Sequence, residues 1–183
     1  MVGYMSVEEQ VDADFSRARR RAFLRRISAR LRKGPIPNCL LCFEEVRRKL
    51  GVAGGVRRGR RTVRLTDIVG SVSRCSEFDG SFLPLREGAR TKWERIDRAF
   101  VRGEELPPVS LYKIGSSYFM EDGNHRVSVY RYQGGRVHRC RSDGVPRLVA
   151  RGPERRRPPD PSPELWRRGC KRGQQIWARS LPW

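Results

Sequence analysis

The fold is decided by one stretch of the chain, which reads Tyr118-Phe119-Met120-Glu121-Asp122-Gly123-Asn124-His125-Arg126-Val127-Ser128-Val129. This pattern predicts a strand that passes through a glycine turn directly into a helix. A helix start leaves backbone N–H groups unpaired and carries about half a positive charge, so it can hold a phosphate. Gly123 lets the backbone approach a ligand closely, and Asn124 is a good N-cap residue. His125 and Arg126 add cationic or hydrogen-bonding side chains, and a guanidinium suits a two-point contact with phosphate.

The segments on the N-terminal side of this turn predict a helix followed by a hairpin. Residues 109–114 and 118–120 are strand-like and are joined by a turn at residues 115–117, so they predict two antiparallel strands. Upstream, Thr91 and Glu94 have the spacing of a capping box at the start of a helix. The apolar stripe of that helix is Trp93, Ile96 and Phe100, and Gly103 marks its end.

The order of these elements resembles the N-terminal domain of the ParB partition proteins, a fold shared with sulfiredoxin and with free serine kinases. The resemblance is carried by four blocks, namely a strand expected at residues 62–69, the helix from Thr91, residues 106–111, and residues 119–134. It is closer still to uncharacterised bacterial ParB-like proteins. The resemblance implies an α+β fold with a small mixed sheet of the ParB/sulfiredoxin type and flanking helices. It also implies that the cofactor is a nucleoside triphosphate with magnesium.

The resemblance assigns roles to particular residues. Gly123, His125 and Arg126 match the Gly-x-x-Arg turn that holds nucleotide phosphates in this superfamily. Asp122 matches an acidic residue of the kinase-like branch. Arg74 follows the first turn, where ParB-like domains carry an arginine that faces the nucleotide. These residues are therefore the expected binding site.

Two departures from the family pattern limit the expected chemistry. Asn124 stands where sulfiredoxin needs its cysteine nucleophile, so reduction of cysteine sulfinic acid is not expected. The ParB motif has a glutamate at the same position, and its loss removes the carboxylate that the resemblance would make catalytic. Phosphate binding survives both changes because it depends on the backbone and on Arg126. Ser128, one turn into the helix, is expected to offer a hydroxyl to the ligand or to the backbone.

Residues 1–61 predict a basic helical extension followed by a linker. A first helix is expected at residues 6–32, and its predicted apolar stripe is Val7, Val11, Phe15, Ala18, Ala22, Ile27 and Leu31. The opposite face is rich in arginine, which suits a DNA phosphate backbone, an anionic membrane or simply solvent. A second helix is expected at residues 43–50, and residues 51–61 have the composition of a flexible basic linker.

The composition favours one compact core and a polyanionic partner. The chain has 183 residues, 37% of them hydrophobic, and a formal net charge of +20. Residues 62–135 are the expected ParB/sulfiredoxin-like domain. Residues 136–183 are rich in arginine and proline, cannot bury an apolar face and predict a disordered tail. No apolar run is long enough to span a bilayer, so a cytoplasmic protein without a membrane span is expected.

The cysteines, at positions 39, 42, 75, 140 and 170, do not predict a disulfide framework. Cys39 and Cys42 have the spacing of a zinc site or a redox pair. No second pair of cysteines or histidines accompanies them, so no metal site is expected.

The sequence leaves several functions open. The first is binding of a nucleotide or another phosphate ligand at residues 122–126. The second is a nucleic-acid-binding module, of the kind used in chromosome partitioning, in which the same turn holds a DNA phosphate and the N-terminal helix adds affinity. The third is a phosphotransferase or nuclease-like enzyme, with Asp122 or Glu121 as base or magnesium ligand and His125 with Arg126 on the phosphoryl group. A polar helix start without a ligand is the alternative to all three.

Overall fold

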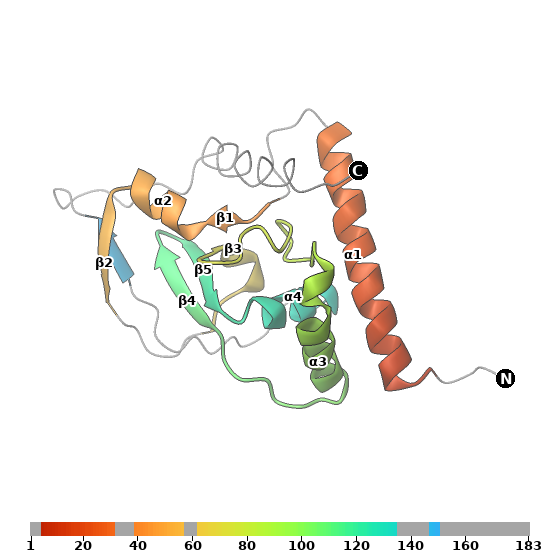
Figure 1. Ribbon diagram of the computed structural model, residues 1–183. Helices are drawn as coiled ribbons and strands as arrows, with labels where there is room; N and C mark the ends of the chain where they lie inside the picture. The colour runs from red at the N-terminus through yellow and green to blue at the C-terminus, as the bar shows by residue number, and fades with distance from the viewer. Residues whose placement is uncertain (1–4, 32–38, 57–61, 135–146, 151–183) are drawn as a thin grey trace.

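The computed structural model describes residues 5–31, 39–56, 62–134 and 147–150, and these form an α+β structure (Figure 1). A mixed sheet of six strands has the order β1-β3-β5-β4-β6-β2. The strands are β1 (Leu41–Cys42), β2 (Val52–Val56), β3 (Ile68–Ser71), β4 (Ser110–Ile114), β5 (Ser117–Asp122) and β6 (Arg147–Ala150). The helices are α1 (Val7–Leu31), α2 (Phe43–Lys49), α3 (Arg90–Val101) and α4 (Asn124–Tyr132), with 3₁₀ turns η1 (Leu65–Asp67) and η2 (Glu87–Ala89). The predicted α+β class is confirmed.

The predicted hairpin forms the centre of the sheet. Strands β4 and β5 pair in antiparallel fashion, and their turn begins at Gly115, which has a φ of +62°. On its other edge β5 runs parallel to β3, with Phe119 opposite Gly70. The central strand therefore ends at Asp122, and the chain passes directly from there into α4.

The two faces of the sheet are covered by different helices, because successive side chains of a strand point to opposite faces. Phe119 packs beneath α2, where its ring meets that of Phe43 at 5.5 Å. Its neighbour Met120 belongs to the core on the other face, together with Leu111 and Val127 of α4. The start of α4 is thus anchored to the sheet through Val127.

Helices α3 and α4 lie between the sheet and α1, which forms the outermost layer (Figure 1). Trp93 of α3 is fully buried at the centre of this helical layer. Its ring meets Phe15 of α1 and Tyr132 of α4 edge to face, each at a centroid distance of 5.5 Å. One aromatic side chain therefore ties the three helices together.

The first helix matches its predicted limits, but its apolar stripe was predicted only in part. Val11, Phe15, Ala18 and Ala22 are buried as expected, whereas Ile27 is 39% and Leu31 79% exposed. The step from Ala22 to Ile27 is five residues, which carries the side chain about 140° beyond a full turn of the helix. The stripe therefore leaves the buried face after Ala22.

The capping box predicted for α3 is wrong. Helix α3 begins at Arg90 without a side-chain cap, because η2 runs directly into it. Glu94 accepts a hydrogen bond from Arg90 at 3.0 Å instead of closing a box with Thr91. A capping box does occur at the start of α1, where Ser6 and Glu9 exchange hydrogen bonds between backbone and side chain.

The strand predicted at residues 62–69 begins only at Ile68, because the preceding residues form η1. The guanidinium of Arg131 in α4 donates hydrogen bonds to the carbonyls of Leu65 and Ile68. Those carbonyls face a helix rather than a neighbouring strand. The turn is therefore fixed by a residue more than sixty positions away, which local patterning does not reveal.

Three strands, β1, β2 and β6, lie where none was predicted. The short β1 pairs with β3. Strand β2 occupies part of the expected linker, and β6 lies within the expected disordered tail. They pair with each other in antiparallel fashion, with Val52 opposite Ala150, and β6 joins β4 through Lys113 and Arg147. Each strand depends on a partner distant in the sequence. Residues 57–61, 135–146 and 151–183 lie outside the described residues, so the rest of the linker and tail predictions stand as predictions.

The cysteine positions did not predict a disulfide framework, but Cys39, Cys42 and Cys75 are all disulfide-bonded. Cys42 and Cys75 form a disulfide, with a Cα–Cα distance of 5.4 Å. Strands β1 and β3 are parallel, with Cys42 opposite Ser71, so the chain leaving β3 reaches Cys75 at the end of the sheet where Cys42 lies. Cys42 is consequently not half of a free Cys-x-x-Cys pair.

Candidate functional site

Gly123 makes the direct passage from β5 to α4 possible. Its φ is +104°, in the left-handed region that glycine adopts without strain. A Cβ atom at this position would lie 2.5 Å from Cγ1 of Val109, so a larger residue does not fit. Gly123 rather than Asn124 is the N-cap residue, which corrects the predicted capping role of Asn124. Asn124 is the first residue of the helix.

The first turn of α4 leaves backbone amides available at the end of the strand. Val127 donates from its amide to the carbonyl of Gly123 at 3.0 Å, which closes the first turn. The amides of residues 124–126 precede it and have no acceptor one turn earlier within the helix. They add partial positive charge at this point.

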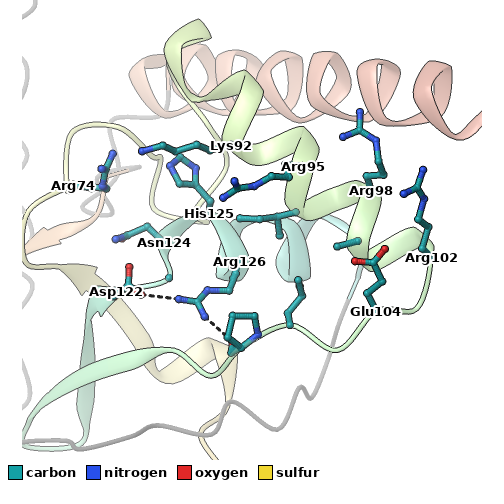
Figure 2. A pocket seen from close by; sticks show the side chains of 15 residues that line it. Arg74, Lys92, Arg95, Arg98, Arg102, Glu104, Asp122, Asn124, His125 and Arg126 are labelled. Carbon is teal, nitrogen blue, oxygen red and sulfur yellow. Dashed lines mark hydrogen bonds and ion pairs between the residues drawn. The ribbon is translucent and has the colours of Figure 1, made fainter.

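A cavity of about 720 Å³ opens beside this turn, between α3, α4 and the loop that leads to β4 (Figure 2). Its lining is strongly cationic. The basic residues that line it are Arg74, Lys92, Arg95, Arg98, Arg102 and Arg126, and the acidic ones are Glu104 and Asp122. The structure thus brings the predicted turn and Arg74 to one cavity whose charge attracts anions.

Two side chains that line this cavity have buried polar atoms without a hydrogen-bond partner among the described residues. Asn124 is 4% exposed, and its Oδ1 atom is buried without a hydrogen bond from any described residue. His125 lies against the ring of Phe78 at 5.2 Å, and both of its ring nitrogens are likewise buried and unpartnered among the described residues. Buried polar atoms are normally hydrogen-bonded, so these atoms are candidates for contact with a ligand.

His125 is neutral at physiological pH. Burial, reinforced by the positive charge of Arg74, lowers its pKa from 6.5 to about 4. The predicted cationic role of His125 is therefore not supported, whereas its hydrogen-bonding role is. A neutral imidazole offers one donor and one acceptor to a ligand.

Arg126 is occupied by protein groups. Its Nη1 atom donates to the carbonyls of Pro107 and Pro108 at 2.6 and 2.7 Å, and Nη2 pairs with Asp122 Oδ2 at 2.7 Å. The side chain is 11% exposed, whereas that of Asp122 is 78% exposed. Arg126 therefore ties the loop before β4 to the turn and adds charge to the cavity. Its predicted two-point contact with a phosphate would require breaking these bonds.

Ser128 lies outside the cavity. It is fully buried, and its Oγ atom accepts a hydrogen bond from Nε1 of Trp93 at 2.9 Å. This contact joins α4 to α3 in the helical layer. The predicted contact of Ser128 with a ligand is therefore wrong, because its hydroxyl faces the core.

Arg74 reaches the cavity from the loop after β3. Its amide donates to Ser71 Oγ at 3.2 Å, and its guanidinium pairs with Glu77 at 2.7 Å. The ion pair leaves Arg74 facing the cavity together with His125 (Figure 2). Arg74 was predicted to face a ligand at the start of α4, and it does line the cavity there.

Sequence reasoning missed the contribution of α3 to the site. Lys92 and Arg95 extend over His125 (Figure 2), and neither pairs with a carboxylate in the described part of the chain. Their spacing of three residues places them on one face of the helix, beside the apolar stripe. Further along the same helix, Arg98 and Arg102 pair with Glu8 of α1. A row of basic residues beside an apolar stripe was the available signal.

Within the described ranges, no three side chains of His, Cys, Asp or Glu gather in a way that would hold a metal ion. No described helix combines the length and apolar character needed to cross a membrane. No protein-family model, curated protein or solved structure matches this chain.

Proposed function

We propose that the protein binds a nucleotide in the basic cavity at the start of α4. The observation that carries this proposal is the combination, in one cavity, of a cationic lining and the unpartnered atoms of Asn124 and His125. The sequence resemblance to the ParB/sulfiredoxin superfamily supports the same turn as a phosphate site. The cavity volume, about 720 Å³, is in the range of small-molecule sites.

The donors of the site suit phosphate oxygens. The amides of residues 124–126 lie in the first turn of α4, and Lys92 and Arg95 supply positive charge that no described carboxylate neutralises. A nucleotide also carries hydroxyl and amino donors. These suit Asn124 Oδ1 and a ring nitrogen of His125, both of which lack a partner among the described residues. A nucleotide therefore fits better than inorganic phosphate.

Magnesium would be bound by the triphosphate rather than by a preformed set of protein ligands. Asp122 and Glu104 are the carboxylates of the cavity, and Asp122 already pairs with Arg126. Glu121, the other candidate ligand, accepts a hydrogen bond from the hydroxyl of Tyr112 at 2.9 Å. The protein's own contribution is thus the positive charge, to which a magnesium nucleotide brings its counter-ion.

Turnover has less support than binding. A histidine with a pKa of about 4 is a weak general base at neutral pH, and Asp122 is held in an ion pair. The phosphotransferase and nuclease alternatives would need Asp122 to leave Arg126 or the pKa of His125 to rise.

A nucleic-acid strand is the second candidate ligand, and one observation favours it. The basic row on α3 runs from Lys92 to Arg102, a length of about 15 Å along the helix. That length suits two or more consecutive phosphates. Binding of a strand would weaken steeply as salt is raised, whereas binding of a single nucleotide would respond mildly.

The test is calorimetric titration with a panel of nucleotides, with and without magnesium, on wild type and on Lys92→Gln/Arg95→Gln. The double variant should bind about tenfold more weakly or worse, because it loses two charge-assisted contacts. Lys49→Gln is the matched control, since Lys49 is exposed on α2 at the other face of the sheet. Equal affinity of the double variant and wild type would place the nucleotide elsewhere.

A further inference from the structure

The C-terminal part of α1 has apolar side chains on two opposite faces. Ala18 and Ala22 are buried against the helical layer. On the other side, large apolar side chains are exposed, and they are Phe23 (61%), Leu24 (57%), Ile27 (39%) and Leu31 (79%). At 3.6 residues per turn these four fall within about 100° of the helix circumference, opposite the two alanines. They form the outward face of α1.

The charges of α1 are segregated along its length. Residues 7–15 contain four acidic residues and no basic one, whereas residues 16–31 contain seven arginines and no acidic residue. The acidic part is engaged with α3, where Glu8 pairs with Arg98 and Asp12 with Arg90. Arg17 pairs with Asp14, and residues 16–31 hold no carboxylate for the other arginines. The outward face of α1 therefore lies among arginines that this part of the helix does not neutralise.

A shallow groove of about 340 Å³ adjoins this face. Arg19, Arg20 and Arg26 line it together with Phe23 and Leu85. Arg19 pairs with Glu87, whereas Arg20 has no ion pair with a described residue. Guanidinium groups at the edge of an apolar surface suit an anionic headgroup attached to an apolar chain.

We propose that the outward face of α1 docks onto an anionic lipid bilayer, with the helix lying parallel to the membrane plane. An anionic bilayer offers negative charge and an apolar phase side by side, which this face matches in both respects. A nucleic-acid backbone would engage the arginines but not the four apolar side chains. A second copy of the chain would bring like charges together. The docking is independent of the α4 cavity, because it uses the opposite side of the helical layer.

The experiment is co-sedimentation of the full chain with phosphatidylcholine vesicles that contain phosphatidylglycerol, and with vesicles of phosphatidylcholine alone. Binding to the anionic vesicles should be at least about tenfold stronger. Phe23→Ser/Leu24→Ser should reduce that binding about tenfold or more, because it removes two inserting side chains. Met5→Ser is the matched control, since Met5 is 53% exposed but lies outside the outward face.

Thermal melts establish that the variants are folded, and Leu31→Ser replaces the double variant if that one unfolds. Three results would overturn the proposal. Wild type that sediments equally with both vesicle types has no preference for anionic lipid. A serine variant that binds anionic vesicles like wild type uses charge alone. Wild type that does not bind vesicles but binds an acidic amphipathic peptide has a protein partner instead. The same holds if it forms a dimer that the serine variant abolishes.

Discussion

The two ends of α4 differ in the charges that other elements bring to them, and at each end these charges have the sign that the helix dipole disfavours. At the N-terminal end, where the dipole is positive, the cavity gathers six basic side chains. At the C-terminal end, where the dipole is negative, the carboxylates of Asp14 and Asp97 are buried under Tyr132 and Gln133. Arg131 in the last turn and Asp122 just before the helix follow the stabilising pattern of basic C-terminal and acidic N-terminal residues, but the side chains packed around each end add charge of the opposite sign.

The two ends relieve this unfavourable charge in different ways. Asp97 can take up a proton, and burial followed by the nearby charge of Asp14 raises its pKa from 3.8 to about 6. Arginine and lysine at the other end cannot lose their charge near neutral pH. Four of the six basic side chains pair with carboxylates, but Lys92 and Arg95 have no such partner among the described residues, so an anionic ligand can neutralise them. The comparison therefore favours a binding site at the N-terminal end and a structural cluster at the other end.

The largest predicted effect is a pair of opposite pH dependences. The stability that Asp97 contributes is complete below pH 3.8 and is lost as pH rises through about 6, because its folded pKa is raised. The stability that His125 contributes is complete above pH 6.5 and is lost as pH falls through about 4, because its folded pKa is lowered. Each change is on the order of 3 kcal/mol and the two have opposite signs, so in wild type they should partly cancel.

Single variants should separate the two pH dependences. In Asp97→Asn, the free energy of unfolding relative to wild type should rise as pH increases from about 4 to 7, leaving the His125 dependence exposed. In His125→Gln it should show the reverse trend. Urea denaturation at several pH values measures both. Parallel pH profiles in the two variants would show that the two ends do not differ as described.

The next effect concerns the anchor of the N-terminal end. Arg126→Ala should lower the free energy of unfolding by about 2 kcal/mol, because it removes hydrogen bonds to Pro107, Pro108 and Asp122. Nucleotide affinity of the folded protein should fall less than in Lys92→Gln/Arg95→Gln. A variant with wild-type stability and abolished binding would show that Arg126 holds the ligand rather than the turn.

The sequence was sufficient where contacts are local. The hairpin, its passage into α4 and the glycine turn were predicted correctly because each depends on neighbouring residues. It was insufficient where a distant partner decides the structure. Strand β2 needs β6, η1 needs the guanidinium of Arg131, and Cys42 needs Cys75 brought near by parallel strands.

The same distinction explains what was right and wrong in the predicted site. Asn124, His125 and Arg74, which were predicted to bind the ligand, line one cavity, and their binding role stays a prediction. Ser128 was predicted to contact the ligand because it follows the motif by one turn. Its hydroxyl instead accepts a hydrogen bond from Trp93, which packs against α4. The charges of Lys92 and Arg95 come from α3, so the motif at the start of α4 did not predict them.

A substitution in the middle of α4 should affect stability without affecting nucleotide binding. Ser128→Ala should lower the free energy of unfolding by about 1 to 2 kcal/mol, because Nε1 of Trp93 would be left without its acceptor inside the core. Nucleotide affinity should not change. Chemical denaturation and calorimetric titration of the same sample measure the two quantities, and a tenfold loss of affinity would restore Ser128 to the site.

The smallest effect should come from Glu8→Gln. Glu8 of α1 pairs with Arg98 and Arg102, both of which line the cavity, so it competes with an anionic ligand for their charge. Its removal should raise nucleotide affinity about two- to threefold at low salt and less at high salt. Glu44→Gln is the matched control, because Glu44 has the same side-chain exposure of 59% and pairs with Arg47 on α2, on the opposite face of the sheet. If both variants raise the affinity equally, the effect is one of net charge, and α1 does not modulate the N-terminal end of α4.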